Sequence, residues 1–311
     1  MRRVALVLCA LLAVVSCADA TVDVPAQVAT TTATPTETAP ATSTPVPTPS
    51  VSVTPPPAEE QSLRFLVIGD FGTGWPEQYA VADRMCRLRR RRPFDLVVTT
   101  GDNIYDYGHP DRFGPAFFRP YDCLFEAGVR FRSTLGNHDI ATDNGRPELN
   151  EPRFGFRGRN YVVRKKGVRF VMVDSNSLRW SWLRRALVTE DGDRWTIVAF
   201  HHPVFSSGEH GSTPGFRPGL PRMFRRKGVD LVLNGHDHNY EATRALRGIR
   251  YVVSGGGGAS IRACGPPIPQ SEKCLARHHF LEVTAGPDRI RVRAIPRDGR
   301  AFHTFTTTGR D

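Results

Sequence analysis

Several apolar segments of this chain end in a residue whose side chain can bind a metal ion, and this recurrence constrains the fold strongly. Each segment is short and almost continuously apolar, which is typical of a strand buried on both faces of a sheet. In α/β proteins, ligands bind beyond the carboxyl ends of such strands, so residues far apart in sequence converge there. The segments are 63–68, 94–100, 129–134, 195–200 and 229–233, and the residues that follow them are Asp70, Asp102, Asn137, His201, His236 and His238.

The remaining elements predict an α/β fold with two stacked mixed β-sheets and helices on the outside. Residues 161–164 and 168–173 form a hairpin pattern through Lys165-Lys166-Gly167. The order of elements is mainly α/β at first and rich in strands towards the end. Further helices are expected at 77–92, 180–188 and 220–227, and further strands at 249–253, 280–284 and 289–295. We expect one domain without internal repeats.

The set of polar residues at the strand ends is a mixed nitrogen and oxygen donor set. Carboxylates and imidazoles suit iron, zinc and manganese. Two Asp, one Asn and three His, with Tyr105 nearby, are more donors than one ion needs. Two ions about 3.5–4 Å apart that share one carboxylate fit this number of donors, and such a pair is used to hydrolyse phosphate esters.

Five short motifs around these residues resemble the calcineurin-like metallophosphoesterases, and most of all the purple (tartrate-resistant type) acid phosphatases. The G-D-F-G form of the first motif and Tyr105, three residues after Asp102, favour that branch. The motifs are Gly69-Asp70-Phe71-Gly72, Gly101-Asp102-Asn103-Ile104-Tyr105, Gly136-Asn137-His138-Asp139, His201-His202-Pro203 and Gly235-His236-Asp237-His238. The resemblance implies a four-layer α/β/β/α sandwich and hydrolysis of phosphate monoesters by a metal-bound hydroxide. It also implies an Fe³⁺ ion paired with Fe²⁺, Zn²⁺ or Mn²⁺.

The resemblance further implies a role for each residue of the site. One set of residues holds the ferric ion and a second set holds the divalent ion, with Asp102 bridging. The first set is Asp70, Asp102, Tyr105 and His238, and the second is Asp102, Asn137, His201 and His236. His201 is preferred over His202 because of its position relative to Pro203. His138 is expected to contact the phosphate and His210 to protonate the leaving group, while Asp139 and Asp237 orient ligands.

Two other functions remain open from the sequence. A phosphodiesterase or nucleotidase would use the same metal core, and the motifs do not separate it from a monoesterase. A non-catalytic cell-envelope protein on the same scaffold would be expected to lack ligands, and none of the expected ligands is missing here.

The N-terminal part of the chain indicates export. Residues 1–16 have the short cationic start and apolar core of a signal peptide. Val14-Val15-Ser16-Cys17 favours lipidation of Cys17 and membrane attachment, whereas Ala18-Asp19-Ala20 offers cleavage to a freely secreted protein. Residues 17–62 are rich in Thr and Pro and form an expected disordered stalk, which leaves 63–311 as the metallophosphoesterase domain.

The cysteines and the charge complete this interpretation. Disulfides are expected because the domain is expected to be exported. The pairs Cys86–Cys123 and Cys264–Cys274 are preferred because Cys264 and Cys274 bracket a Pro-rich loop, and the other two pairings and free thiols stay open. The net charge of +11 comes mainly from arginine. It is interpreted as a solvated surface, and no nucleic-acid partner is expected because no aromatic-interleaved basic stripe is present. His109, His278, His279 and His303 belong to no motif and are expected at the surface or in loops.

Overall fold

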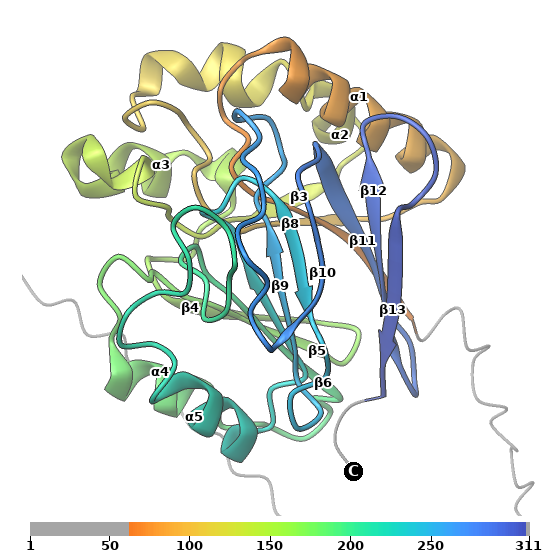
Figure 1. The fold of residues 1–311 in the computed structure, drawn as a ribbon. Coiled ribbons are helices and arrows are strands. Elements are labelled where there is room, and N and C mark those ends of the chain that lie inside the picture. Colours follow the sequence, from red (N-terminus) through yellow and green to blue (C-terminus); the bar gives the residue numbers. More distant parts are fainter. Residues whose placement is uncertain (1–61, 309–311) are drawn as a thin grey trace, which may run out of the picture. The chain divides into compact units, whose positions relative to one another are not determined.

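Two β-sheets packed face to face form the centre of the molecule (Figure 1), seen in a computed structural model that describes residues 62–308. The expected signal peptide, Cys17 and all but the last residue of the expected stalk lie outside the described residues. Within residues 62–308, none of the helices has the length and apolar character that a membrane crossing requires.

The first sheet has six strands in the order β13-β12-β11-β1-β2-β3. Strands β1, β2 and β3 run parallel, while β11, β12 and β13 join them in antiparallel pairing. The strands are β1 (Leu63–Ile68), β2 (Leu96–Thr99), β3 (Arg130–Arg132), β11 (His279–Ala285), β12 (Ile290–Pro296) and β13 (His303–Thr307).

The second sheet has seven strands in the order β10-β8-β9-β7-β6-β5-β4. Its centre is the parallel run β5, β6, β7 and β9. Antiparallel pairing joins β4 to β5, β8 to β9 and β10 to β8. The strands are β4 (Tyr161–Lys165), β5 (Val168–Met172), β6 (Trp195–Ala199), β7 (Leu231–Asn234), β8 (Tyr240–Thr243), β9 (Arg250–Ser254) and β10 (Ser271–Leu275). Both sheets are therefore mixed, as predicted.

Alternating side chains of the parallel strands fill separate apolar layers. In β1, Phe65 and Val67 face the core between the sheets, whereas Leu66 and Ile68 belong to the cluster on the outer face. Phe65 meets Phe170 of the second sheet edge to face, with ring centroids 5.0 Å apart. Burial of each such side chain contributes roughly 1.5–3 kcal/mol, so both faces of these strands stabilise the sandwich.

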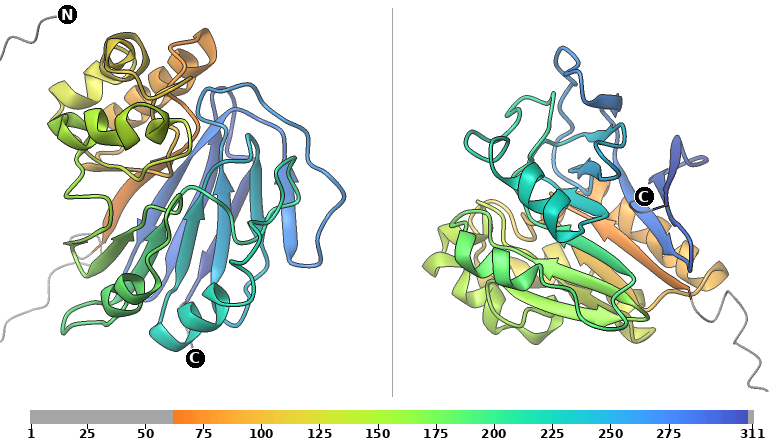
Figure 2. Two further views of the ribbon diagram at one scale, coloured as in Figure 1. Left: turned by 90° about the vertical axis from the view of Figure 1, so that its left-hand side faces the viewer. Right: turned by 90° about the horizontal axis from the view of Figure 1, so that it is seen from below.

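Helices cover the outer face of each sheet, which gives the predicted α/β/β/α layering. Val81 and Met85 of α1 pack into the outer cluster of the first sheet, and Leu183 of α4 and Phe224 of α5 into that of the second. In the left view of Figure 2, the orange and yellow helices lie at the top, and the darker green and teal helices α4 and α5 lie at the bottom. The helices are α1 (Pro76–Arg91), α2 (Asp122–Glu126), α3 (Arg146–Asn150), α4 (Trp180–Ala186) and α5 (Leu220–Lys227), with single turns at Pro110–Arg112, Gly114–Phe118, Asp139–Ala141, Asp143–Gly145 and Pro152–Phe154.

Two disulfides join segments of the domain, and both belong to the preferred pairing. Cys86–Cys123 links α1 to α2, and Cys264–Cys274 closes a loop onto β10. The hairpin between β4 and β5 turns at Lys166 and Gly167, which both have positive φ. A two-residue turn of this kind suits the twist of the flanking strands, and the hairpin prediction is confirmed.

The sequence patterns did not predict three strands and misplaced one histidine. Strands β8, β10 and β13 carry many polar residues, so their pattern does not indicate a strand. His279, expected at the surface or in a loop, is fully buried in β11 and binds Ser254 and the carbonyl of Arg277. Because His279 is buried in a strand, the expectation that it lies at the surface or in a loop was wrong.

Candidate metal centre

The residues expected at the strand ends do come together where both sheets end. Asp70 follows β1 and Asp102 follows β2 in the first sheet, while His201 follows β6 and His236 follows β7 in the second. Backbone hydrogen bonds join the loops within each sheet, from Asp70 N to the Gly101 carbonyl at 3.0 Å and from Gly235 N to the His201 carbonyl at 2.9 Å. The His236 N–H donates to both carboxylate oxygens of Asp70 at 3.0 Å, which ties the two sheets together.

Glycines that precede the ligand residues let these loops approach one another closely. A Cβ atom at Gly136 would lie 2.1 Å from Oδ1 of Asp102, and a Cβ atom at Gly235 would lie 2.4 Å from Oδ2 of Asp70. Both distances are far below contact distance, so any side chain at these two positions would displace a carboxylate. The glycines of the motifs are thus needed for the geometry of the site itself.

The donor atoms form two groups that meet at one oxygen of Asp102. Oδ2 of Asp102 is 3.4 Å from Nε2 of His201 and 3.0 Å from the hydroxyl oxygen of Tyr105. Oδ2 of Asp102 thus lies between the two ligand sets that the sequence resemblance separates. We call the seven side chains of both sets the rim: Asp70, Asp102, Tyr105, Asn137, His201, His236 and His238.

The group beyond His201 contains Asn137 and His236. Nε2 of His201 is 2.9 Å from Oδ1 of Asn137 and 3.1 Å from Nδ1 of His236. The group beyond Tyr105 contains His238 and Asp70. The Tyr105 hydroxyl is 3.0 Å from Nε2 of His238, which is 3.7 Å from Oδ1 of Asp70. The structure therefore brings all seven expected ligand residues together.

Backbone carbonyls orient two of the imidazoles. Nδ1 of His201 faces the Thr100 carbonyl at 3.0 Å, and Nδ1 of His238 faces the Ser260 carbonyl at 2.9 Å. A carbonyl only accepts hydrogen bonds, so Nδ1 carries the proton in each ring. In a neutral ring Nε2 then presents a lone pair, and in both residues this atom points to the centre of the rim. Metal-binding histidines are held in the correct tautomer by such contacts.

Without bound metal ions, burial disfavours the charged forms of the rim side chains. It raises the pKa of Asp70 well above the ordinary value, and the neighbouring Asp102 carboxylate raises it further. Burial also raises the pKa of Asp102 and that of Tyr105. The histidines shift the other way, because burial lowers the pKa of His201 and His236 and brings that of His238 to about 4. The imidazoles are therefore neutral at neutral pH.

The donor set fits metal ions, because no Lys or Arg side chain within residues 62–308 forms an ion pair with its carboxylates. Within residues 62–308, the ion-pair partners of Asp70 and Asp102 are all histidines. Two triads have donor atoms within 4.8 Å of one another, one formed by Asp70, Asp102 and His201 and the other by His201, His202 and His236. The rim thus brings together the lone pairs of neutral imidazoles, carboxylates and an amide oxygen. Bound metal ions would supply positive charge and form the bonds that these lone pairs leave open.

Asp139 holds the loops that carry Asp102 and Asn137. Its buried carboxylate accepts backbone N–H groups of Gly136 at 2.7 Å, Asn103 at 2.8 Å and Ile104 at 3.0 Å. Burial raises its pKa to about 7, with a further contribution from Asp102. The side chain of Asn103 connects Asp139 to the buried Glu148. Asp139 thus positions the backbone of both motifs, in agreement with its expected orienting role.

The two expected catalytic histidines contact different residues of the rim. The His138 N–H donates to Oδ1 of Asp102 at 3.0 Å, and its ring packs on Tyr105 with centroids 4.4 Å apart. The exposed His210 stacks on His236 with ring centroids 4.3 Å apart. Nε2 of His210 contacts Nη1 of Arg262, and because a guanidinium only donates, this nitrogen is the acceptor.

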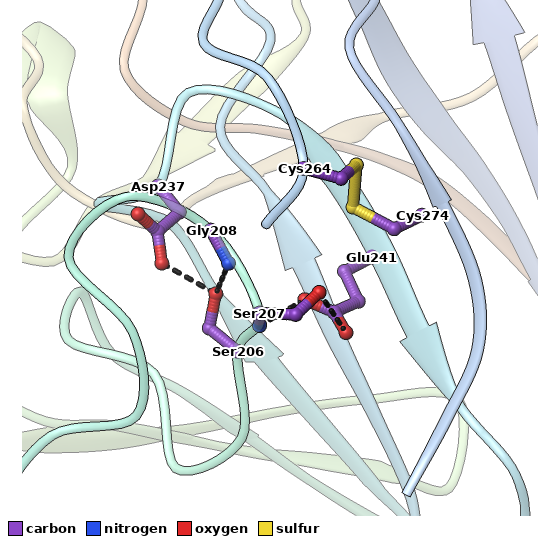
Figure 3. Close-up of a disulfide and its surroundings, with 7 residues drawn as sticks. All are labelled: Ser206, Ser207, Gly208, Asp237, Glu241, Cys264 and Cys274. Atoms are coloured by element: carbon purple, nitrogen blue, oxygen red, sulfur yellow. Dashed lines mark hydrogen bonds between the residues drawn. A yellow bond between two sulfur atoms is a disulfide. The ribbon is translucent and has the colours of Figure 1, made fainter. Parts of the chain in front are cut away.

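Two loops border the rim on the His210 side, residues 206–212 and 260–270, which we call the mouth loops. Oδ1 of Asp237 accepts the His210 N–H at 2.8 Å, and Oδ2 accepts the Ser206 hydroxyl. Ser207 binds Glu241 through its N–H at 2.6 Å and its hydroxyl at 2.9 Å. Figure 3 shows these carboxylates beside the Cys264–Cys274 disulfide. Asp237, which directly follows His236 in the sequence, therefore orients the loop of His210.

Two residues of the site received no metal or catalytic role from the sequence. His202 lies with its ring centroid 4.6 Å from that of His236, and its Nδ1 is 2.8 Å from the Ser175 hydroxyl. The adjacent pair His201-His202 is the signal that could have found it. Arg262 lies outside every motif, and nothing in its local sequence indicates its place beside His210.

The comparisons with known proteins agree with this geometry. Residues 63–240 match the family model described as calcineurin-like phosphoesterase. Purple acid phosphatase 17 of Arabidopsis thaliana is 28% identical over 71% of this chain and 75% of its own length. Purple acid phosphatase 3 of the same plant is 29% identical over 81% and 80%, and mouse tartrate-resistant acid phosphatase type 5 is 27% identical over 64% and 74%.

Solved structures show the same fold. The purple acid phosphatase PPD1 from yellow lupin seeds superposes with a TM-score of 0.70 at 20% identity, over 80% of this chain and 54% of the lupin chain. GAP50, the anchor in the inner membrane complex of Plasmodium, superposes with a TM-score of 0.69 at 18% identity, over 80% and 90%. The predicted sandwich of two mixed sheets is thereby confirmed.

Proposed function

The chain belongs to the calcineurin-like phosphoesterase family, and we propose that it is an exported phosphatase that hydrolyses phosphate monoesters at a two-metal centre on the rim. It is a metal-dependent phosphoric ester hydrolase with purple acid phosphatases among its homologues. The position of Asp102 Oδ2 between the His201 and Tyr105 donors is the observation that carries the two-metal proposal.

The proposed ligand sets follow the two groups of donors around Asp102. Asp70, Tyr105 and His238 hold one ion with Asp102, and Asn137, His201 and His236 hold the other with the same carboxylate. Short contacts within each group support this division, from the 3.0 Å between Tyr105 and His238 to the 2.9 Å between Asn137 and His201.

Bound ions at such a centre polarise the phosphoryl group and make water a better nucleophile near neutral pH. The chain itself orients the reactants. His138 lies against Tyr105 and within 4.0 Å of Asp102, and we assign it to contact the phosphoryl oxygens. His210 lies over His236, and we assign it to deliver a proton to the leaving oxygen once its Nε2 is released from Arg262.

Tyr105 supports an iron-containing centre. A phenolate bound to Fe³⁺ absorbs visible light, and a purple colour follows. We propose Fe³⁺ at the Tyr105 side and Fe²⁺, Zn²⁺ or Mn²⁺ at the His201 side. Loss of the visible band in Tyr105→Phe, with metal content retained, is expected; an active, colourless protein that contains only zinc or manganese would contradict the iron assignment.

The preference for monoesters is tested with matched esters. The metal-loaded wild type is expected to hydrolyse 4-nitrophenyl phosphate faster than bis(4-nitrophenyl) phosphate. Faster cleavage of the bis ester would favour a phosphodiesterase on the same core, and 5′-nucleotides would be tested alongside. No hydrolysis of any ester by the metal-loaded protein would contradict the proposed function.

The location of the domain is also a proposal. We infer that residues 1–16 direct export, that residues 17–62 form a stalk, and that residues 63–311 are the catalytic domain, attached to a membrane through lipidated Cys17. The two disulfides support export because such bonds persist in oxidising compartments. Labelling with a lipid precursor that the wild type incorporates and Cys17→Ala does not would support attachment; an unlabelled wild type would favour free secretion.

A further inference from the structure

Arg262 places a guanidinium at the entrance to the proposed metal centre. Its Nη1 contacts Nε2 of His210, and its Nε lies 3.6 Å from Oε2 of Glu209. The His210 ring stacks directly on the ring of His236, with centroids 4.3 Å apart. The His210 ring therefore lies between the Arg262 guanidinium and the ring of His236, a proposed metal ligand.

The loop of Arg262 is held at several points, so the guanidinium has a defined position. The Arg262 N–H donates to the His238 carbonyl at 3.0 Å, which ties the loop to a rim residue. Gly265 N donates to the Ser207 carbonyl at 2.7 Å, which ties the two mouth loops together. The Cys264–Cys274 disulfide fastens the same loop to β10, as Figure 3 shows.

The charge of Arg262 is only weakly balanced in the protein alone. Its ion-pair partner Glu209 has 64% of its side chain exposed, and exposed pairs contribute little. Arginine offers five N–H donors in a planar fork that matches a carboxylate or a phosphate. The contacts with His210 and Glu209 leave part of this fork for another anion. The side chain is 31% exposed, so such an anion can reach it from solvent.

We propose that Arg262 makes the enzyme prefer phosphate monoesters whose leaving group carries a second negative charge. The inference rests on the proposed function, in which the phosphoryl group binds at the rim and the leaving oxygen faces His210. An anionic group on the leaving side would then pair with Arg262 and draw the guanidinium away from His210. A neutral leaving group would make no such contact.

Two aryl phosphates that differ by one carboxylate on the leaving group test the proposal. We compare kcat/KM for phenyl phosphate and 4-carboxyphenyl phosphate in the wild type, Arg262→Met, Arg262→Lys and Glu209→Gln. Because a hydrogen bond between charged groups is worth about 1.5–3 kcal/mol, Arg262→Met is expected to lose roughly 10- to 100-fold more activity on the carboxylated ester. Arg262→Lys should keep part of the preference, and Glu209→Gln should increase it.

Arg225 lies on the exposed face of α5, away from the mouth loops, and Arg225→Met makes the same change in charge. This control is expected to leave the ratio of kcat/KM for the two esters unchanged. Equal losses on both esters in Arg262→Met would overturn the proposal. So would a wild type that favours the carboxylated ester no more than Arg262→Met does.

A binding measurement separates this inference from the proposed function. Calorimetry with phenylphosphonate and 4-carboxyphenylphosphonate reports recognition without turnover. Weaker binding of the carboxylated phosphonate in Arg262→Met supports the role of Arg262 even if the wild type hydrolyses neither ester, an outcome that would contradict the proposed function alone. Equal affinities of the wild type and Arg262→Met for the carboxylated phosphonate would overturn the role of Arg262.

Discussion

The rim and the mouth loops lie side by side but are held in place by different means. The rim residues are positioned by backbone contacts between glycine-containing loops at strand ends, and most of them are buried. The mouth loops are positioned by side chains bound to Asp237 and Glu241 and by a disulfide, and His210 reaches solvent. We propose that the rim binds the metals and the mouth loops act on the leaving group, so that substitutions in the two regions have different effects.

Loss of Asp102, the carboxylate that we propose to be shared by both ions, should have the largest effect on activity. Asp102→Ala removes the oxygen that lies between both donor groups. The ions contribute several kcal/mol to the transition state, so we expect a loss in kcat of about a thousandfold or more. Steady-state kinetics with 4-nitrophenyl phosphate checks this. The control Asp111→Asn changes an exposed carboxylate and should retain activity, whereas wild-type rates in Asp102→Ala would show that this residue is not shared.

Acid should weaken the metal-free rim through its neutral histidines. The pKa of His238 falls from 6.5 to about 4 on folding, so the unfolded chain binds the proton more readily between these values. The contribution of this group to the free energy of unfolding is fully present above about pH 6.5. It is lost as the pH drops towards 4, by on the order of 3 kcal/mol. Melting temperatures of metal-free protein at pH 7 and pH 4.5 measure it. His238→Gln should have a smaller pH dependence, and an unchanged one would contradict the assignment.

The buried carboxylate behind the rim should have an intermediate effect. Asp139→Asn replaces the acceptor of three backbone N–H groups in the Asp102 and Asn137 loops. Removing a contact that orients ligands typically lowers metal affinity about 10- to 100-fold. Competition with a chelator would measure this affinity. Asp143→Asn, an exposed change in the following turn, should leave affinity unchanged, and equal affinities in all three proteins would show that Asp139 does not position the rim.

A change confined to the mouth loops should have the smallest effect and spare the metals. Ser206→Ala removes the hydroxyl that donates to Asp237 and accepts from Gly208 N at 2.9 Å. Two hydrogen bonds are lost, each worth about 1 kcal/mol, so we expect kcat/KM to fall about 5- to 30-fold with metal content unchanged. Elemental analysis beside kinetics checks both parts. Loss of metal in this variant would show that the two regions are coupled.

The same difference explains which parts of the site the sequence could predict. Asp70, Asp102 and Asn137 each stand after an apolar segment and a glycine, so a short stretch of sequence contains the whole signal. The order of the parallel strands then brings these residues together. The almost continuous apolar run of β1 likewise predicts that both faces of this strand are buried.

The mouth loops could not be predicted in this way. Arg262 meets His210 across 52 positions, and their contact depends on Asp237, Glu241 and a disulfide acting together. An arginine in an arginine-rich chain carries no local signal of such a role. Strand β8 was missed for a related reason, because its buried Glu241 is polar and becomes compatible with a strand only through Ser207.

Metal stoichiometry measured on the purified protein tests the two-metal rim most directly. We predict about two metal ions per chain in the wild type. His236→Ala and His238→Ala, which remove one donor from opposite sides of Asp102, should each retain about one ion. A wild type that binds a single ion, or two variants that lose the same ion, would contradict the assignment of separate ligand sets around Asp102.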